Sequence, residues 1–331
     1  MSSDAPLLQV TGLRKHFVMR QGFPTSRTTI IRAVEDVSLT IQPGEAVGLV
    51  GESGCGKSTA ARAMLRLIEP TAGQVRFKGQ DVLAARGDAL KTIRRKMQIV
   101  FQDPYSSLNP RQTIGSALME PMRVHHIATG AQARARAAAQ LDEVGLPANA
   151  LDRYPHEFSG GQRQRIGIAR ALTVEPELIV ADEPVSALDV SVQAQVLLLL
   201  RELRIRRGLA FLFVSHDLSV VRWFCDRVAV MYLGRIVEEG PVAEVLRAPL
   251  HPYANMLREA SPEPDPARRG KLPRIIGEIP SAAAPPTGCA FHPRCMGAMQ
   301  ACARVVPPLR PLGGGRAVAC HLYDPAVAAA N

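Results

Sequence analysis

An α/β fold built around a parallel sheet is predicted by three short apolar segments and by the polar residues that end them. Segments 46–50 (AVGLV), 178–182 (LIVAD) and 211–217 (FLFVSHD) each have the composition of a buried parallel strand. Chemically capable residues stand at the carboxyl end of each segment. Because open α/β sheets bind ligands outside the carboxyl ends of their strands, we expect a ligand site at this edge.

The segments around these strands predict two further layers of structure. Residues 7–43 are expected to form short strands and turns, with the polar stretch 20–32 as a loop between two strands. From about Phe101 the pattern becomes helical, most clearly in AQARARAAAQ (131–140). We interpret residues from about 103 to 165 as an inserted helical subdomain.

The composition changes after about Ala248, where proline becomes dense and four of the six cysteines occur. This change predicts a linker followed by a small module. The expected organisation is one large domain over residues 1–250 and an extension over residues 251–331, whose last residues are expected to fray.

Charge and hydropathy limit the partners and the cellular compartment that the chain can be expected to have. Lys and Arg number 40 against 30 Asp and Glu, an excess that favours phosphates, nucleic acid or acidic lipid as partners without choosing among them. No apolar stretch reaches the roughly 20 residues of a membrane span, and the N-terminus lacks the pattern of a signal peptide. We expect a cytoplasmic protein whose cysteines are mostly reduced.

A glycine-rich motif follows the first strand. GESGCGKS (51–58) fits G-x-x-x-x-G-K-[ST] in full, between a predicted strand and a predicted helix. Its glycines let successive backbone N–H groups turn toward phosphate oxygens, Lys57 supplies charge to the β and γ phosphates, and Ser58 offers a hydroxyl to Mg²⁺. The alternative is a glycine-rich turn with a chance Lys and Ser. The predicted ATP-binding set is Gly51, Glu52, Ser53, Gly54, Cys55, Gly56, Lys57, Ser58 and Thr59.

Two adjacent acids end the second strand. Asp182 is placed to hold Mg²⁺ directly or through water, and Glu183 to orient and polarise an attacking water. The alternative, two merely solvated acids, is disfavoured by the presence of the glycine-rich motif.

FSGGQRQR (158–165) adds a second hydroxyl-and-amide turn at a predicted helix start. Here the chain resembles the ATP-binding-cassette family, whose signature is L-S-G-G-Q, with Phe158 in place of Leu. The resemblance covers about residues 7–250. It implies a RecA-like core, an antiparallel β subdomain and a helical subdomain, with two ATP molecules held between head-to-tail subunits. The residues that would contact the partner's ATP are Ser159, Gly160, Gly161 and Gln162. The alternative is an ordinary serine N-cap.

The resemblance assigns roles to other residues. It implies that Gln102 reaches Mg²⁺ and the attacking water, and that His216 contacts the γ-phosphate. An aromatic ring should stack on adenine, and we choose Phe17 over its competitor Phe23. The loop that would pass the partner subunit comprises Ser186, Ala187, Leu188 and Asp189.

Finer motifs resemble the ATPases of dipeptide and oligopeptide importers, in particular the second, F-type subunit. They include FQDPYSSLNPR (101–111), HPY (251–253) and PPTGCAFHPRC (285–295). The resemblance implies a second, non-identical ATPase chain, two permease subunits and, indirectly, a substrate-binding protein, at the cytoplasmic face of the inner membrane and without nucleic acid. Related systems import nickel or glutathione. A soluble cassette ATPase of DNA repair or translation and a metal-sensing regulator are the rival classes.

Four cysteines of the extension, Cys289, Cys295, Cys302 and Cys320, are spaced C-x5-C-x6-C-x17-C. Four thiolates suit Zn²⁺ or an iron–sulfur cluster, although the C-x2-C knuckle usual for zinc is missing. The resemblance implies a four-iron, four-sulfur cluster, and free or structural cysteines are the third possibility. Cys55 is expected to fill space within the glycine-rich motif and Cys225 to lie in the core.

Overall fold

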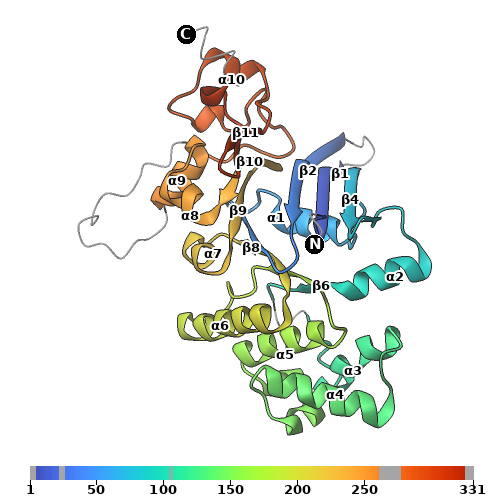
Figure 1. Ribbon diagram of the computed structural model, residues 1–331. Coiled ribbons are helices and arrows are strands. Elements are labelled where there is room, and N and C mark those ends of the chain that lie inside the picture. The colour runs from blue at the N-terminus through green and yellow to red at the C-terminus, as the bar shows by residue number, and fades with distance from the viewer. Residues whose placement is uncertain (1–4, 22–26, 104, 106, 261–276, 325–331) are drawn as a thin grey trace. The chain divides into compact units, whose positions relative to one another are not determined.

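The computed structural model describes residues 5–21, 27–103, 105, 107–260 and 277–324 (Figure 1). It contains two compact units. The first comprises mainly Phe77–Val214, and the second comprises Leu8–Thr40, Val47–Arg76 and the chain from Ser215 onward. Each unit is described by itself.

The first unit holds strands β6 (Met97–Val100) and β7 (Leu178–Asp182), which pair in parallel with Met97 opposite Leu178. Strand β8 (Ala210–Ser215) continues the sheet in parallel beside β7. All residues of β7 and β8 are buried, as their uninterrupted apolar runs predict. The carboxyl ends of these strands therefore carry the polar residues to one edge.

The helices of this unit begin after short polar turns. Their bounds are α2 Gly87–Lys96, α3 Ile114–Val124, α4 Gly130–Glu143, α5 Gly160–Leu172 and α6 Val190–Arg207. The short strand β5 is Gln80–Asp81, and single 3₁₀ turns lie at Ala148–Asp152 and Pro155–Glu157. Among the described residues, no helix combines the length and the apolar character needed to cross a bilayer.

The second unit begins with two long strands, β1 (Leu8–Gln21) and β2 (Arg27–Ile41). The expectation of short strands with a loop at 20–32 is therefore wrong, because strand pairing extends through most of that polar stretch. The other strands are β3 Ala46–Val50, β4 Ala72–Phe77, β9 Arg227–Tyr232 and β10 Arg235–Pro241, and the helices are α1 Lys57–Met64, α7 Leu218–Phe224, α8 Val242–Arg247 and α9 Pro252–Ala260.

Within the second unit the strands follow the order β4-β1-β2-β10-β9-β3. Strand β3 is parallel to β9, with Val47 opposite Arg227, and β10 is antiparallel to β9. The parallel β3 ends at the glycine-rich motif, and α1 follows that motif directly. This strand–loop–helix order is the one that the sequence predicted for a phosphate site.

The C-terminal extension is attached to this sheet by backbone pairing and by aromatic packing. Its elements are α10 Gln300–Arg304, β11 Arg310–Gly313 and β12 Arg316–Val318. Strand β12 pairs antiparallel with β10. The ring of Phe291 lies 5.3 Å from that of Tyr232 and 5.4 Å from that of Tyr253, measured between centroids. All three rings are buried, so the small extension shares its core with the unit that carries it.

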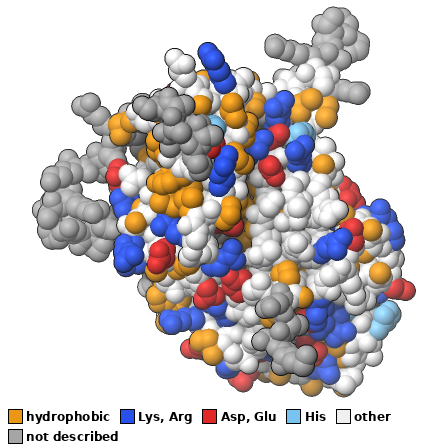
Figure 2. Space-filling view, turned by 45° about the horizontal axis from the view of Figure 1, so that its top comes forward, with side chains coloured by type: hydrophobic (Ala, Val, Ile, Leu, Met, Phe, Trp, Pro, Cys, Tyr) orange, Lys and Arg blue, Asp and Glu red, His pale blue; other side chains and the backbone are white. Residues whose placement is uncertain are grey.

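The basic excess does not gather on the face shown in Figure 2. There the Lys and Arg side chains of the described residues are interspersed with Asp and Glu.

Candidate functional site

The phosphate loop (51–58) takes a shape that only glycine permits at key positions. Gly54 and Gly56 have φ of 78° and 104°, in the region that other residues avoid. A Cβ on Gly56 would lie 2.0 Å from the carbonyl oxygen of Ala33. The loop therefore turns tightly before α1 begins at Lys57, and the positive end of that helix adjoins it.

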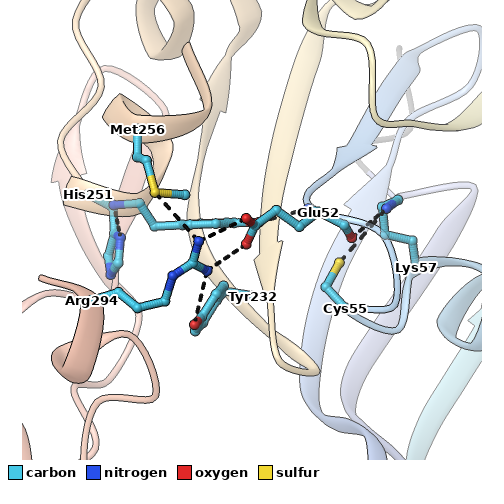
Figure 3. Close-up of polar contacts among 8 residues, drawn as sticks. Glu52, Cys55, Lys57, Tyr232, His251, Met256 and Arg294 are labelled. Atoms are coloured by element: carbon cyan, nitrogen blue, oxygen red, sulfur yellow. Dashed lines mark hydrogen bonds and ion pairs between the residues drawn. The ribbon is translucent and has the colours of Figure 1, made fainter. Parts of the chain in front are cut away.

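Lys57 lies within the loop rather than in solvent. Its side chain is buried, and its Nζ donates to the carbonyl oxygens of Gly51 at 2.8 Å and of Glu52 at 3.0 Å (Figure 3). The buried Cys55 thiol lies 3.9 Å from the same Nζ, and burial raises its pKa. Cys55 therefore packs the loop as a neutral thiol, as the sequence predicted. Ser58 and Thr59 are half-buried in the first turn of α1, and Ser53 is exposed.

Glu52 is held by two residues that sequence reasoning did not place at the site. Its backbone N–H donates to the Tyr253 hydroxyl at 2.8 Å. Its carboxylate accepts two hydrogen bonds from Arg294, from Nη1 at 2.8 Å and Nη2 at 3.0 Å (Figure 3). Tyr253 belongs to the HPY motif and Arg294 to the motif CAFHPRC. Those motifs pointed to a family but carried no local signal of a contact with residue 52.

The remaining predicted residues of the second unit lie at its surface. His216 is exposed between β8 and α7, and the next residue, Asp217, caps α7 by accepting from the N–H of Ser219 at 2.8 Å. The Phe17 ring on β1 is 37% exposed and lies 4.9 Å from Nζ of Lys15. The competing Phe23 lies outside the described residues. The roles of His216 and Phe17 remain predictions.

In the first unit, the structure brings two predicted catalytic residues into contact. Nε2 of Gln102 donates to Oε2 of Glu183 at 3.1 Å. Glu183 has φ of 47°, a conformation that is uncommon outside glycine and is concentrated at functional sites. Its N–H donates to the carbonyl of Val214 at 3.0 Å, which ties it to β8. Asp182 is fully buried at the end of β7.

The turn 158–162, here called the signature turn, is stabilised by its own residues. The Oγ of Ser159 accepts from the N–H of Gln162 at 3.3 Å, and Oε1 of Gln162 accepts from the N–H of Ser159 at 3.0 Å. Phe158 is buried and anchors the turn, as an apolar replacement for Leu should. A Cβ on Gly161 would lie 2.3 Å from Val192, so α5 and α6 pack closely there. Gly160 opens α5.

The segment Ser186, Ala187, Leu188 and Asp189 links Glu183 to α6. The Oγ of Ser186 donates to the carbonyl of Glu183 at 3.1 Å, and Nε2 of Gln193 donates to that of Leu188 at 2.8 Å. Ser186, Ala187 and Asp189 are exposed. The segment is therefore available for contact with another chain.

The prediction of an iron–sulfur cluster at Cys289, Cys295, Cys302 and Cys320 is wrong. Across the described residues, no group of three or more His, Cys, Asp or Glu side chains is arranged to hold a metal ion, zinc included. Burial raises the pKa of the Cys320 thiol to about 11 and also raises the pKa values of Cys289 and Cys295. The chain around Cys289 and Cys302 is held by backbone pairing, since the N–H of Cys289 donates to the carbonyl of Cys302 at 2.7 Å.

Comparisons with known proteins agree with this geometry. The ABC transporter family model matches residues 34–186, and that of the oligopeptide/dipeptide transporter C-terminal region matches residues 237–302. A probable peptide ABC transporter ATP-binding protein of Sinorhizobium fredii is 53% identical, with 99% of this chain and 92% of that protein aligned. The oligopeptide transport ATP-binding protein AppF of Bacillus subtilis is 49% identical over 98% of this chain and 99% of its own. The dimeric, post-hydrolysis structure of the cassette MJ0796 with ADP and phosphate superposes with a TM-score of 0.62 at 32% identity, covering 71% of this chain and 98% of that one.

Proposed function

Because this chain belongs to the ABC transporter family, among its peptide-import ATP-binding proteins, we propose that it hydrolyses ATP to drive uptake of dipeptides or oligopeptides through a membrane permease. The chain is an ATPase subunit of an importer. The similarity that spans 99% of the chain supports the peptide cargo. The hydrogen bond between Gln102 and Glu183 carries the assignment of the hydrolytic residues.

The proposed reaction assigns separate tasks to the two units. The phosphate loop and Lys57 bind the triphosphate, and Phe17 stacks on adenine. Glu183, oriented by Gln102, accepts a proton from the attacking water, while His216 contacts the γ-phosphate. Ser58, Asp182 and Gln102 offer the hard oxygen ligands that Mg²⁺ prefers, and Asp182 is a fully buried carboxylate. When bound, Mg²⁺ neutralises charge on the phosphates.

The proposed partners are those that the family implies, and the signature turn is proposed to contact one of them. Ser159, Gly160, Gly161 and Gln162 close over ATP held by a second, non-identical ATPase chain, and the segment 186–189 contacts that chain. The exposure of Ser159 and Gln162 supports this role. Two permease subunits complete the transporter, and a substrate-binding protein delivers the cargo to them. The chain itself lies peripherally at the cytoplasmic face of the inner membrane.

The Glu183→Gln variant tests the hydrolytic assignment. We expect the assembled transporter to retain ATP binding and to lose ATP turnover and uptake by about 100-fold or more, because the amide is a poor proton acceptor. Glu175→Gln is the matched control, since Glu175 is an exposed glutamate of the same unit whose φ is also positive, at 56°. Normal uptake by the Glu183→Gln transporter would remove Glu183 from its role.

Uptake assays test the cargo. Vesicles that contain the purified assembly should accumulate labelled dipeptides or oligopeptides when ATP is supplied. Accumulation of nickel or glutathione alone would replace the peptide cargo. Purification of the chain without any permease would favour a soluble ATPase instead.

A further inference from the structure

We propose that the C-terminal extension positions the phosphate loop, and that Arg294 (Figure 3) and Tyr253 set nucleotide affinity by holding Glu52. The inference rests on the proposed ATP site at residues 51–58. It assigns to the extension a part in nucleotide binding that the two matching family models and the names of the relatives given above do not describe.

Arg294 is built into the protein as a fixed cation. Its side chain is 1% exposed, and the Glu52 carboxylate that it meets is 19% exposed. The two hydrogen bonds between guanidinium and carboxylate form a bidentate pair, which fixes orientation as well as distance. Nη1 also lies 3.4 Å from the Tyr232 hydroxyl, and Nη2 lies 3.8 Å from Sδ of Met256. The Glu52 carboxylate raises the pKa of Arg294 still further, so the charge is permanent.

Tyr253 holds the backbone of the same residue. Its hydroxyl accepts from the N–H of Glu52, and its fully buried ring packs against those of Tyr232 and Phe291. The start of α9 is fixed in turn, because Nδ1 of His251 accepts from the N–H of Tyr253 at 3.0 Å. The tyrosine hydroxyl is therefore a rigid acceptor.

Three groups thus converge on one residue of the loop. Arg294 binds the carboxylate of Glu52, Tyr253 binds its N–H, and Lys57 binds its carbonyl. A shift of Glu52 displaces a contact of Lys57, the residue assigned to the β and γ phosphates. The loop's geometry is consequently tied to residues about two hundred positions further along the chain.

Electrostatics give Arg294 a second effect on anion binding. Glu52 places a carboxylate inside a loop that is to bind a triphosphate, and like charges at short range oppose binding. The paired guanidinium neutralises that carboxylate. Removing Arg294 should therefore both loosen the loop and leave a half-buried negative charge beside the nucleotide.

The test compares nucleotide affinity among variants of the full chain, using a non-hydrolysable ATP analogue with Mg²⁺. We expect Arg294→Gln to weaken binding about 10- to 100-fold, from a lost charge-assisted pair. Tyr253→Phe removes only the hydroxyl and should weaken binding about fivefold. Arg310→Gln is the matched control, because Arg310 forms its ion pair with Asp324, at 2.9 Å, and should stay within twofold of the parent.

Two further measurements separate positioning from general instability. In a Glu52→Gln background, Arg294→Gln should lose much less affinity, because no unpaired carboxylate remains. In the assembled transporter, KM for ATP should rise more than kcat falls. Tyr253→Phe keeps the aromatic packing, so it tests the proposal even where Arg294→Gln fails to fold.

The proposal is overturned if the parent protein binds the analogue and both Tyr253→Phe and Arg294→Gln bind it equally well. It is also overturned if the losses from Glu52→Gln and Arg294→Gln simply add. Failure of the parent protein itself to bind would count against the proposed ATP site instead.

Discussion

The phosphate loop and the signature turn both present glycine-rich backbone at a helix start, yet different parts of the chain hold them. The signature turn is closed by hydrogen bonds between Ser159 and Gln162, three residues apart. The phosphate loop is held at Glu52 by Arg294, 242 positions away. A sequence motif can therefore predict the ligand of a turn without predicting which residues hold that turn in place.

The strongest test of this contrast is Lys57→Ala. Lys57 is the one residue that we assign both to the nucleotide and to the loop's own carbonyls, so its loss removes charge and support together. We expect nucleotide affinity of the full chain to fall about 100-fold. Lys78→Ala is the control, since Lys78 pairs with Glu177 at 2.9 Å in the other unit. Unchanged affinity in Lys57→Ala would mean that the loop does not bind the triphosphate.

Sequence reasoning succeeded where the signal was local. The apolar runs of β3, β7 and β8 predicted buried parallel strands, because a strand that is buried on both faces is apolar along nearly its whole length. The same holds for the signature turn, whose capping residues lie within one helical turn of each other.

It failed where structure depends on distant partners. The polar residues after position 20 resemble a loop, although β1 and β2 extend to Gln21 and from Arg27. The family resemblance implied a cluster at the four cysteines, but neither a resemblance nor a spacing encodes the arrangement of thiols in space, and no metal-holding group exists among the described residues. The contact between Arg294 and Glu52 likewise has no local signature.

Acid should weaken the distant support of the phosphate loop. Burial of the imidazole ring lowers the pKa of His251 to about 4. The same ring supports Tyr253, whose N–H donates to its Nδ1. The unfolded chain takes up this proton near pH 6.5, whereas the folded chain takes it up only near pH 4. Stability from His251 is thus complete above about pH 6.5 and is lost as pH falls toward 4, by about 2–4 kcal/mol.

The His251→Asn variant isolates the contribution of His251 to the pH dependence of stability, because Asn is a good helix N-cap that does not titrate. Urea unfolding between pH 7 and 4 should show a shallower loss of stability in the variant than in the parent. The carboxylate of Glu238 accepts from the N–H of His251 at 2.7 Å and is paired with Arg316. Because Glu238 is present in the parent and in the variant, it does not contribute to the difference between them. His156→Asn changes an exposed histidine, and its free energy of unfolding should depend on pH as that of the parent does. Identical slopes in His251→Asn and the parent would contradict the prediction.

The smallest expected effect belongs to the signature turn, and it tests whether that turn is held locally. Ser159→Ala removes the hydroxyl that accepts from Gln162 and should lower the free energy of unfolding by about 1 kcal/mol, and Ser159→Gly by only a few tenths. Hydrogen exchange should localise the change to the first turn of α5. The Arg294→Gln variant should leave exchange in that turn unchanged, because the support of the turn lies within residues 158–162. Faster exchange there in Arg294→Gln would show that the C-terminal extension supports both turns, and the contrast between them would not hold.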